Sequence, residues 1–304
     1  ASAATAAPLN PSYREEEFRF YLDDLNAKAL ITREGGAPAA HAAAGPDVAR
    51  LVLDGEFGAL NLVSDGSTPA AATPVSAEPD DVALVLHTSG TTSRPKIVPL
   101  RQRNLAASAG NIVQSLRLTP EDRCLNIMPL FHIHGLIAAV LSSVAAGASV
   151  ACSPGFDAFR FFDWLDDARP SWYTAVPTMH QLILGRGPKN AHIIAANPLR
   201  FMRSSSASLP PIVMEQIEAL FGAPMIEAYG MTEASHQMTT NALPPGVRKP
   251  GAVGVGVGVE VRIMDDVGNL LERGQTGEVV IKGPNVTDGY ESNPEANEKA
   301  YTNG

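Results

Sequence analysis

"LHTSGTTSRPKIV", residues 86–98, is the stretch from which most of the fold and chemistry of this chain can be inferred. An apolar run, residues 82–86, leads into it and has the composition of a buried strand. A glycine turn at the end of a strand exposes backbone N–H groups, hydroxyl side chains add donors, and Lys96 adds a positive charge. The stretch therefore predicts a phosphate-binding loop, with a plain polar turn as the alternative on composition alone. It is not the Walker loop, because Arg94 and Pro95 stand where that loop has its second glycine.

The composition indicates a globular protein and excludes several classes of partner. The chain has 304 residues, 45% hydrophobic and 18% charged, enough for one large or two ordinary domains. A formal net charge of -9 and the lack of a long basic run argue against nucleic acid as a partner. Cys124 and Cys152 lack the spacing of a disulfide framework or a thiolate metal site. The most apolar stretch, residues 136–150, is shorter than the roughly 20 residues of a spanning helix, so no membrane span is expected.

Along the chain, helical and strand patterns alternate, which is typical of an α/β fold with a parallel sheet. Amphipathic helices are predicted at residues 12–25, 105–116 and 210–221, and a short strand at residues 49–53. From residue 251 onward apolar and polar residues alternate, and this pattern predicts β-hairpins in a small barrel-like arrangement. We therefore expect an α/β core over residues 1–250 and a β-rich, barrel-like part over residues 251–304.

Five motifs together resemble the adenylate-forming superfamily of acyl-CoA synthetases, luciferases and peptide-synthetase adenylation domains. They are TSGTTSRPK (88–96), MPLFHIHGL (128–136), EAYGMTEASH (227–236), KPGAVG (249–254) and GEVVIKGPNVTDGY (277–290). Their order and approximate spacing match those of the family, and the resemblance covers essentially the whole chain. It implies a fragment of the large N-terminal domain, with both the core and the barrel-like part incomplete and the mobile C-terminal domain absent. We therefore expect the middle part of a larger enzyme, inactive alone.

The resemblance implies that a carboxylate is joined to AMP from ATP and that the acyl group then passes to a thiol, usually coenzyme A. Mg²⁺ is the implied cofactor, ATP and coenzyme A are the implied cosubstrates, and an intracellular location, cytoplasmic or peroxisomal, is expected. The residues that match the family's nucleotide-binding positions are Thr88, Ser89, Gly90, Thr91, Thr92, Lys96, Glu227, Ala228, Tyr229, Gly230, Met231 and Thr232. Ser93 and Ile97 stand where the family usually has glycine, which indicates a subfamily.

Four of the matching residues are predicted to act in catalysis: Lys96, His132, Thr232 and Glu233. Tyr229 matches the aromatic residue that stacks on adenine, Thr232 a donor to the α-phosphate, and Glu233 the Mg²⁺ ligand. The alternatives are a packing role for Tyr229 and an exposed surface position for Glu233. A zinc pair of His132 and His134 is rejected, because no third ligand follows at a suitable spacing.

Four stretches together resemble the oxalate-CoA ligase branch: HTSGTTSRPK (87–96), RSSSASLPP (203–211), EAYGMTEASHQMTTNALPP (227–245) and GPNVTDGYESNPEAN (283–297). Oxalate carries a second carboxylate next to the reacting one, so its pocket needs donors or a cation. The predicted substrate-binding residues are His132, His134, Arg203, Ser206 and His236. Of these we expect His132, Ser206 and His236 to clamp the second carboxylate, assisted by the charge of Arg203.

Alternatives remain open at this stage. His236 as a surface residue and Arg203 as a tie at a strand end are the structural alternatives to the clamp. A fatty-acyl or aryl-CoA ligase and a peptide-synthetase adenylation domain are the alternative enzymes. A non-catalytic nucleotide-binding module is the alternative from a different class.

Overall fold

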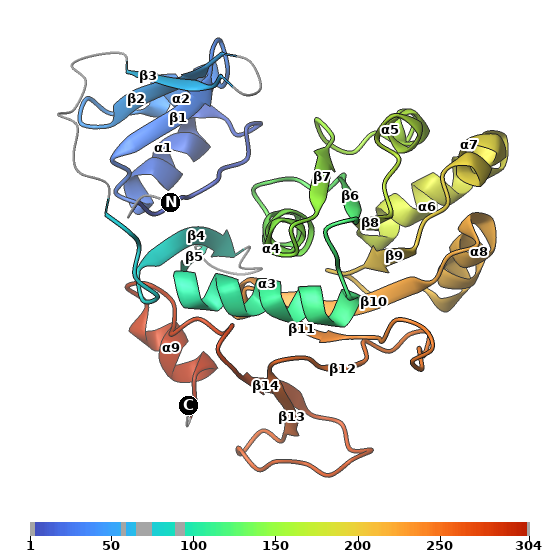
Figure 1. Cartoon of the computed structure of the whole chain (residues 1–304). Coiled ribbons are helices and arrows are strands. Elements are labelled where there is room, and N and C mark those ends of the chain that lie inside the picture. Colours follow the sequence, from blue (N-terminus) through green and yellow to red (C-terminus); the bar gives the residue numbers. More distant parts are fainter. Residues whose placement is uncertain (1–3, 56–58, 65–74, 89–94, 303–304) are drawn as a thin grey trace. The chain divides into compact units, whose positions relative to one another are not determined.

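The computed structural model of the chain describes residues 4–55, 59–64, 75–88 and 95–302 (Figure 1). Apart from a few residues at its start, the chain forms two compact units, residues 7–76 and residues 77–304. Residues 251–304 belong to the larger unit, and the expected subdivision at residue 250 stays a prediction.

The smaller unit combines two helices with a three-stranded sheet. Its elements are α1 (Glu15–Asp24), β1 (Ala29–Arg33), α2 (Pro38–Ala43), β2 (Ala49–Asp54) and β3 (Asn61–Ser64). β1 and β2 run parallel, and β3 pairs antiparallel with β2. Phe18 and Leu22, one turn apart on α1, are buried in a cluster with alanines of α2. The predicted opening helix is confirmed, and Glu17 caps its start by accepting the Arg14 N–H at 2.8 Å.

A seven-stranded sheet forms the centre of the larger unit (Figure 1). Its strands are β6 (Arg123–Asn126), β7 (Ser149–Cys152), β8 (Trp172–Ala175), β9 (Phe201–Ser204), β10 (Met225–Met231), β11 (His236–Thr240) and β12 (Val255–Gly256). The order across the sheet is β12-β11-β10-β9-β8-β6-β7. The five neighbouring strands β10, β9, β8, β6 and β7 are parallel, whereas β11 pairs antiparallel with β10 and β12 antiparallel with β11. The predicted α/β class with a parallel sheet is confirmed.

Helices pack against both faces of this sheet. The helices described in the larger unit are α3 (Gln102–Leu116), the π-helix η1 (His134–Leu141), α4 (Ser142–Ala145), α5 (Phe161–Ala168), α6 (Pro177–Arg186), η2 (Gly187–Asn190), α7 (Ala191–Ala196), α8 (Pro211–Phe221), η3 (Thr232–Ala234) and α9 (Pro294–Ala300). Because neighbouring strand residues point to opposite faces, Trp172 and Phe201 pack with α3 and η1, whereas Tyr173 and Met202 pack with α5, α6 and α8. None of the described helices is long and apolar enough to cross a membrane.

Two antiparallel strand pairs complete the larger unit. β4 (Val82–Thr88) pairs with β5 (Lys96–Arg101), so that Thr88 lies opposite Lys96 at the end of the hairpin. β13 (Glu260–Met264) pairs with β14 (Glu278–Lys282), as the alternating pattern predicts. Within the described part of residues 251–304 these strands do not close into a barrel, so the barrel-like arrangement is limited to a two-stranded ribbon and the short β12.

Candidate functional site

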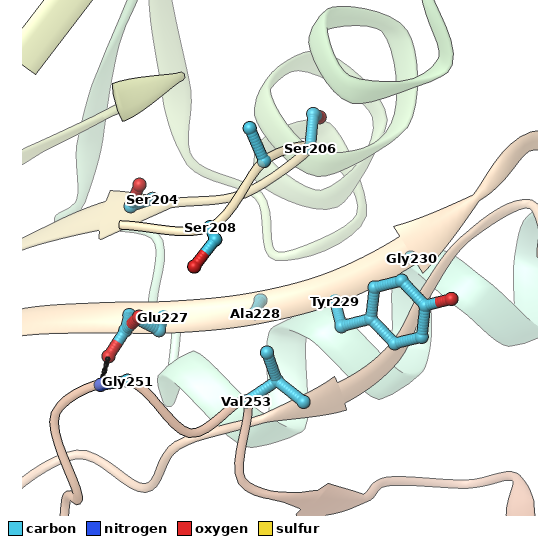
Figure 2. A pocket seen from close by; sticks show the side chains of 10 residues that line it. Ser204, Ser206, Ser208, Glu227, Ala228, Tyr229, Gly230, Gly251 and Val253 are labelled. Atoms are coloured by element: carbon cyan, nitrogen blue, oxygen red, sulfur yellow. Dashed lines mark hydrogen bonds between the residues drawn. The ribbon is translucent and has the colours of Figure 1, made fainter. Parts of the chain in front are cut away.

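A cavity of about 280 Å³ opens beside the carboxyl ends of β9 and β10 in the larger unit (Figure 2). Ligands of open α/β folds commonly bind beyond the carboxyl ends of the parallel strands. The cavity is lined by Ser204, Ser206, Ala207, Ser208, Glu227, Ala228, Tyr229, Gly230, Gly251 and Val253. Four of the residues predicted to bind nucleotide, 227–230, therefore lie on its wall together with Ser206, a predicted substrate-binding residue.

Tyr229 is set in place by an irregularity in β10. The register between β10 and β11 shifts between Tyr229 and Gly230. A Cβ atom on Gly230 would lie 1.7 Å from the backbone oxygen of His236, so only glycine fits this close approach. The ring of Tyr229 remains 39% exposed and lies along the cavity (Figure 2), which does not match a role in core packing.

Glu227 joins two walls of the cavity. Its carboxylate accepts the Gly251 N–H at 3.1 Å, the dashed contact in Figure 2. Burial raises the pKa of Glu227, and the hydrogen bond from Gly251 opposes that effect. The contact holds the segment with Gly251 and Val253 against β10.

Lys96, predicted to bind phosphate, and Glu233, predicted to bind Mg²⁺, both contact Tyr290. The hydroxyl of Tyr290 donates to Glu233 Oε1 at 2.7 Å, and Lys96 Nζ lies 4.6 Å from the centre of the same ring. Glu233 follows Thr232 in η3, and Lys96 begins β5 opposite Thr88. Glu233 is partly buried, so it is not the solvated acid of the alternative interpretation. The rest of the predicted loop, Ser89, Gly90, Thr91 and Thr92, lies outside the described residues.

Behind Ser206 lies a fully buried guanidinium, that of Arg203. Its Nη2 donates to His236 Nε2 and to Gln237 Oε1, each at 3.1 Å. In the described parts of the chain no carboxylate pairs with Arg203, and its Nε has no hydrogen-bond partner. Burial lowers the pKa of Arg203 to about 10, which leaves the side chain charged at neutral pH. A buried positive charge thus stands beside the cavity wall without a counter-charge from the described residues.

His134 connects this charge to the cavity. Its Nε2 lies 2.6 Å from Thr174 Oγ1 and 3.4 Å from Arg203 Nη1, and its Nδ1 lies 3.0 Å from Ser206 Oγ. Its ring stacks on His236 with the centres 4.9 Å apart. Burial holds the pKa of both histidines well below the usual value, so both are neutral at pH 7.

The hydrogen-bond network assigns the positions of the protons on these rings. A guanidinium only donates, so Nε2 is assigned as the acceptor nitrogen of His134 and of His236, and the proton of each ring lies on Nδ1. His134 then donates to Ser206, whose own hydroxyl proton is left for a group in the cavity. The arrangement is suited to recognition of an anion.

The structure separates one predicted residue from this network. His132 is exposed and its ring contacts Phe131 with the centres 4.8 Å apart, and among the described residues it makes no hydrogen bond to Arg203, His134, Ser206 or His236. Of the expected clamp, Ser206 and His236 are linked, but through His134 and not His132. The surface interpretation of His236 is wrong, because this side chain is 1% exposed.

Sequence reasoning did not identify Thr174, Gln237 or Tyr290 as parts of the site. Tyr290 ends a motif that carries the family resemblance, so the motif itself contained a signal for it. Gln237 directly follows the motif that ends at His236, but glutamine has no charge that would single it out. Thr174 lies in the apolar strand β8, whose sequence gives no sign of a polar contact.

The residues near Glu233 fit a magnesium ion bound together with phosphates. In the parts of the chain that the structure describes, no three His, Cys, Asp or Glu side chains are grouped to hold a metal by themselves. Mg²⁺ is usually held by only one or two carboxylates, with substrate phosphates and water as the other ligands. Glu233 has one oxygen bonded to Tyr290 and a second that no other described residue contacts by a hydrogen bond.

Comparison with known proteins agrees with this geometry. An oxalate-CoA ligase of Arabidopsis thaliana is 48% identical over 307 residues, which cover 98% of this chain and 59% of that protein. An oxalate-CoA ligase of Saccharomyces cerevisiae is 41% identical, with 99% of this chain and 59% of that protein covered. The chain therefore spans less than two thirds of the length of these curated relatives.

Solved structures give the same result for the fold. The crystal structure of ATP-bound MatB from Rhodopseudomonas palustris superposes with a TM-score of 0.80 at 30% identity, covering 98% of this chain and 59% of that one. The sequence pattern of the AMP-binding enzyme family matches residues 1–291. The resemblance found from the five motifs is thereby confirmed, and the chain belongs to the family of AMP-binding enzymes.

Proposed function

We propose that the protein containing this chain is an AMP-forming acid–thiol ligase that activates a small carboxylate, oxalate in the first place, and transfers it to coenzyme A. Family membership and the two oxalate-CoA ligases among the relatives support this class of reaction. The polar cavity at the ends of β9 and β10 is the proposed site of the adenylate.

The observation that carries the choice of substrate is the buried charge of Arg203. A buried cation without a counter-charge is unfavourable unless an anion compensates it. Arg203 does not line the cavity itself, and it acts through its neighbours: it fixes the proton positions of His134 and His236, and His134 orients Ser206. The second carboxylate of oxalate would accept the Ser206 hydroxyl and lie in the field of the guanidinium. A fatty-acyl chain would gain nothing from this polar wall.

The nucleotide end of the site follows from the motif positions. Tyr229 is proposed to stack on adenine, and Lys96 and Thr232 to contact phosphates. Glu233 is the proposed carboxylate ligand of Mg²⁺, which when bound would offset the charge that develops as an anion attacks the α-phosphate. The catalytic role predicted for His132 stays a prediction, because its exposed ring lies outside the network around Arg203.

Calorimetry tests the proposal in two stages. The purified chain is first titrated with ATP and Mg²⁺, and then oxalate, malonate, hexanoate or benzoate is added to the nucleotide-bound chain. We expect heat from oxalate that depends on nucleotide, and little from hexanoate or benzoate. A preference for the apolar acids would favour the alternative ligases, whereas nucleotide binding without response to any acid would favour a binding module. Thioester formation is then measured in a version of the protein as long as its relatives.

A further inference from the structure

Residues 284–291 form a strap that contacts both the hairpin of β4 and β5 and the turn at η3. The N–H of Thr287 donates to the Glu233 backbone oxygen at 2.8 Å, and the N–H of Glu291 donates to the Ile97 oxygen at 3.0 Å. Asn285 Nδ2 donates to the Ala234 oxygen at 2.9 Å. The strap therefore fixes the position of Tyr290 through backbone contacts that do not involve its hydroxyl.

Tyr290 stands between a cation and an anion. Lys96 lies over its ring, with Nζ 4.6 Å from the centre, while its hydroxyl donates to Glu233. No ion pair joins Lys96 to Glu233, although both are described and both contact the same side chain. A direct pair would satisfy each charge with the other and leave neither for phosphate or metal.

We infer that Tyr290 is a positioning residue that keeps Lys96 and Glu233 apart, so that the lysine stays available to a phosphate and the carboxylate to a divalent cation. The inference rests on the roles proposed above for these two charges. The aromatic face holds the ammonium group by a cation–π contact, and the hydroxyl fixes one carboxylate oxygen and leaves the other open. Without the tyrosine, the flexible lysine would reach the carboxylate.

The chain offers a matched control in Tyr301. Its ring packs edge-to-face on that of Tyr290 with the centres 5.8 Å apart, and its buried hydroxyl has no hydrogen-bond partner in the described residues. Tyr290→Phe removes a hydroxyl bonded to Glu233, whereas Tyr301→Phe removes a neighbouring hydroxyl bonded to no described group. Circular dichroism melting of both variants checks that each is folded.

The first arm of the experiment measures the dependence of ATP binding on Mg²⁺ by calorimetry. Tyr290→Phe is expected to weaken the apparent affinity for Mg²⁺ about tenfold, in line with the loss of a hydrogen bond to a charged group, and Tyr301→Phe to change it less than about twofold. In the Glu233→Gln background, Tyr290→Phe should add little, since its effect passes through that carboxylate. Equal losses in the two phenylalanine variants, or independent effects of Tyr290 and Glu233, would overturn the inference.

The second arm needs no nucleotide. The coupling between Lys96→Met and Glu233→Gln is measured in the equilibrium constant of unfolding, once with Tyr290 present and once with Tyr290→Ala. We expect almost no coupling with tyrosine and a coupling of about two- to fivefold with alanine, the size of a partly exposed ion pair. Absence of coupling in both backgrounds would refute the spacer role. If the expected coupling between Lys96 and Glu233 is found but the chain binds no ATP, the spacer role of Tyr290 is supported and only the proposed function is refuted.

Discussion

Ser206→Ala is the substitution that most directly tests how the buried charge serves the substrate. Ser206 lines the cavity, and its oxygen lies 3.0 Å from His134 Nδ1, so its own proton is free to donate to a carboxylate. A hydrogen bond to a charged group contributes about 1.5 to 3 kcal/mol, and each 1.4 kcal/mol is about a tenfold change in affinity. We therefore expect the oxalate affinity to fall by about ten- to a hundredfold, with ATP affinity unchanged. Calorimetry on the nucleotide-bound chain measures both.

The backbone at Ser206 supplies the control. Its φ of 72° lies in the left-handed region, where glycine is favoured. Ser206→Gly removes the hydroxyl and at the same time relaxes this strain, so equal losses in the alanine and glycine variants would assign the effect to the hydroxyl. His236→Ala, which removes the partner 3.1 Å from Arg203 Nη2, should weaken oxalate in the same way. Unchanged oxalate affinity in both Ser206→Ala and His236→Ala would refute the oxalate assignment and favour the other acyl substrates.

Three further predictions concern the nucleotide site and stability. Glu233→Gln should slow adenylation by about a hundredfold or more, because charge stabilisation by a metal is worth several kcal/mol. Lys96→Ala should slow adenylation less than Glu233→Gln. Pyrophosphate exchange measures both rates, and a larger loss in Lys96→Ala would contradict the assigned roles. Gly230→Ala should destabilise the chain by about 1 to 3 kcal/mol or more, since its Cβ would lie 1.7 Å from the His236 oxygen, as urea unfolding can measure. Burial lowers the pKa of His180 from 6.5 to about 4. Between these two pH values His180 is therefore mostly protonated in the unfolded chain and mostly neutral in the folded chain. Stability should therefore fall by about 2 kcal/mol from pH 7 to 5 through His180 alone, and a flat profile in urea unfolding would contradict this.

The sequence predicts the α/β layers well because both faces of the central strands are apolar. Trp172 and Tyr173 are neighbours in β8 yet belong to opposite buried clusters, and the helices between strands carry one apolar face each. β5 was not predicted, because Pro99 interrupts its pattern. The proline is tolerated since, among the described strands, β5 pairs only with β4 and is therefore an edge strand. The barrel-like arrangement was overestimated, because alternation in β13 and β14 predicts a pair of strands but not the partners that would close it.

The candidate site was predictable where the residues sit in one motif and not where they meet from distant segments. The motif at residues 227–236 supplies both Tyr229 and Glu233. By contrast, the network around Arg203 draws on β8, β9, β11 and the start of η1. The clamp was predicted to use His132 of "FHIHG", although the sequence there gives no basis to prefer it to His134. The structure distinguishes the two histidines by their burial. The helix η1 begins at His134 and places that ring in the core, whereas the preceding turn leaves His132 exposed.

The two polar networks meet on one short turn of the chain. Glu233 is held by Tyr290 on one side, and His236, three residues later, is held by Arg203 on the other. Ser235 and His236 both have left-handed backbones, with φ of 50° and 97°, an unfavourable conformation that persists only where surrounding contacts impose it. The Ser235 oxygen accepts the buried Ser108 hydroxyl at 2.6 Å, and these contacts fix the turn from α3 as well. Because one rigid turn carries both the proposed metal ligand and a buried partner of Arg203, the backbone sets the distance between the proposed metal position and the buried charge proposed to attract the second carboxylate. That constraint favours a short, rigid dicarboxylate over a flexible acid whose charge can occupy many positions.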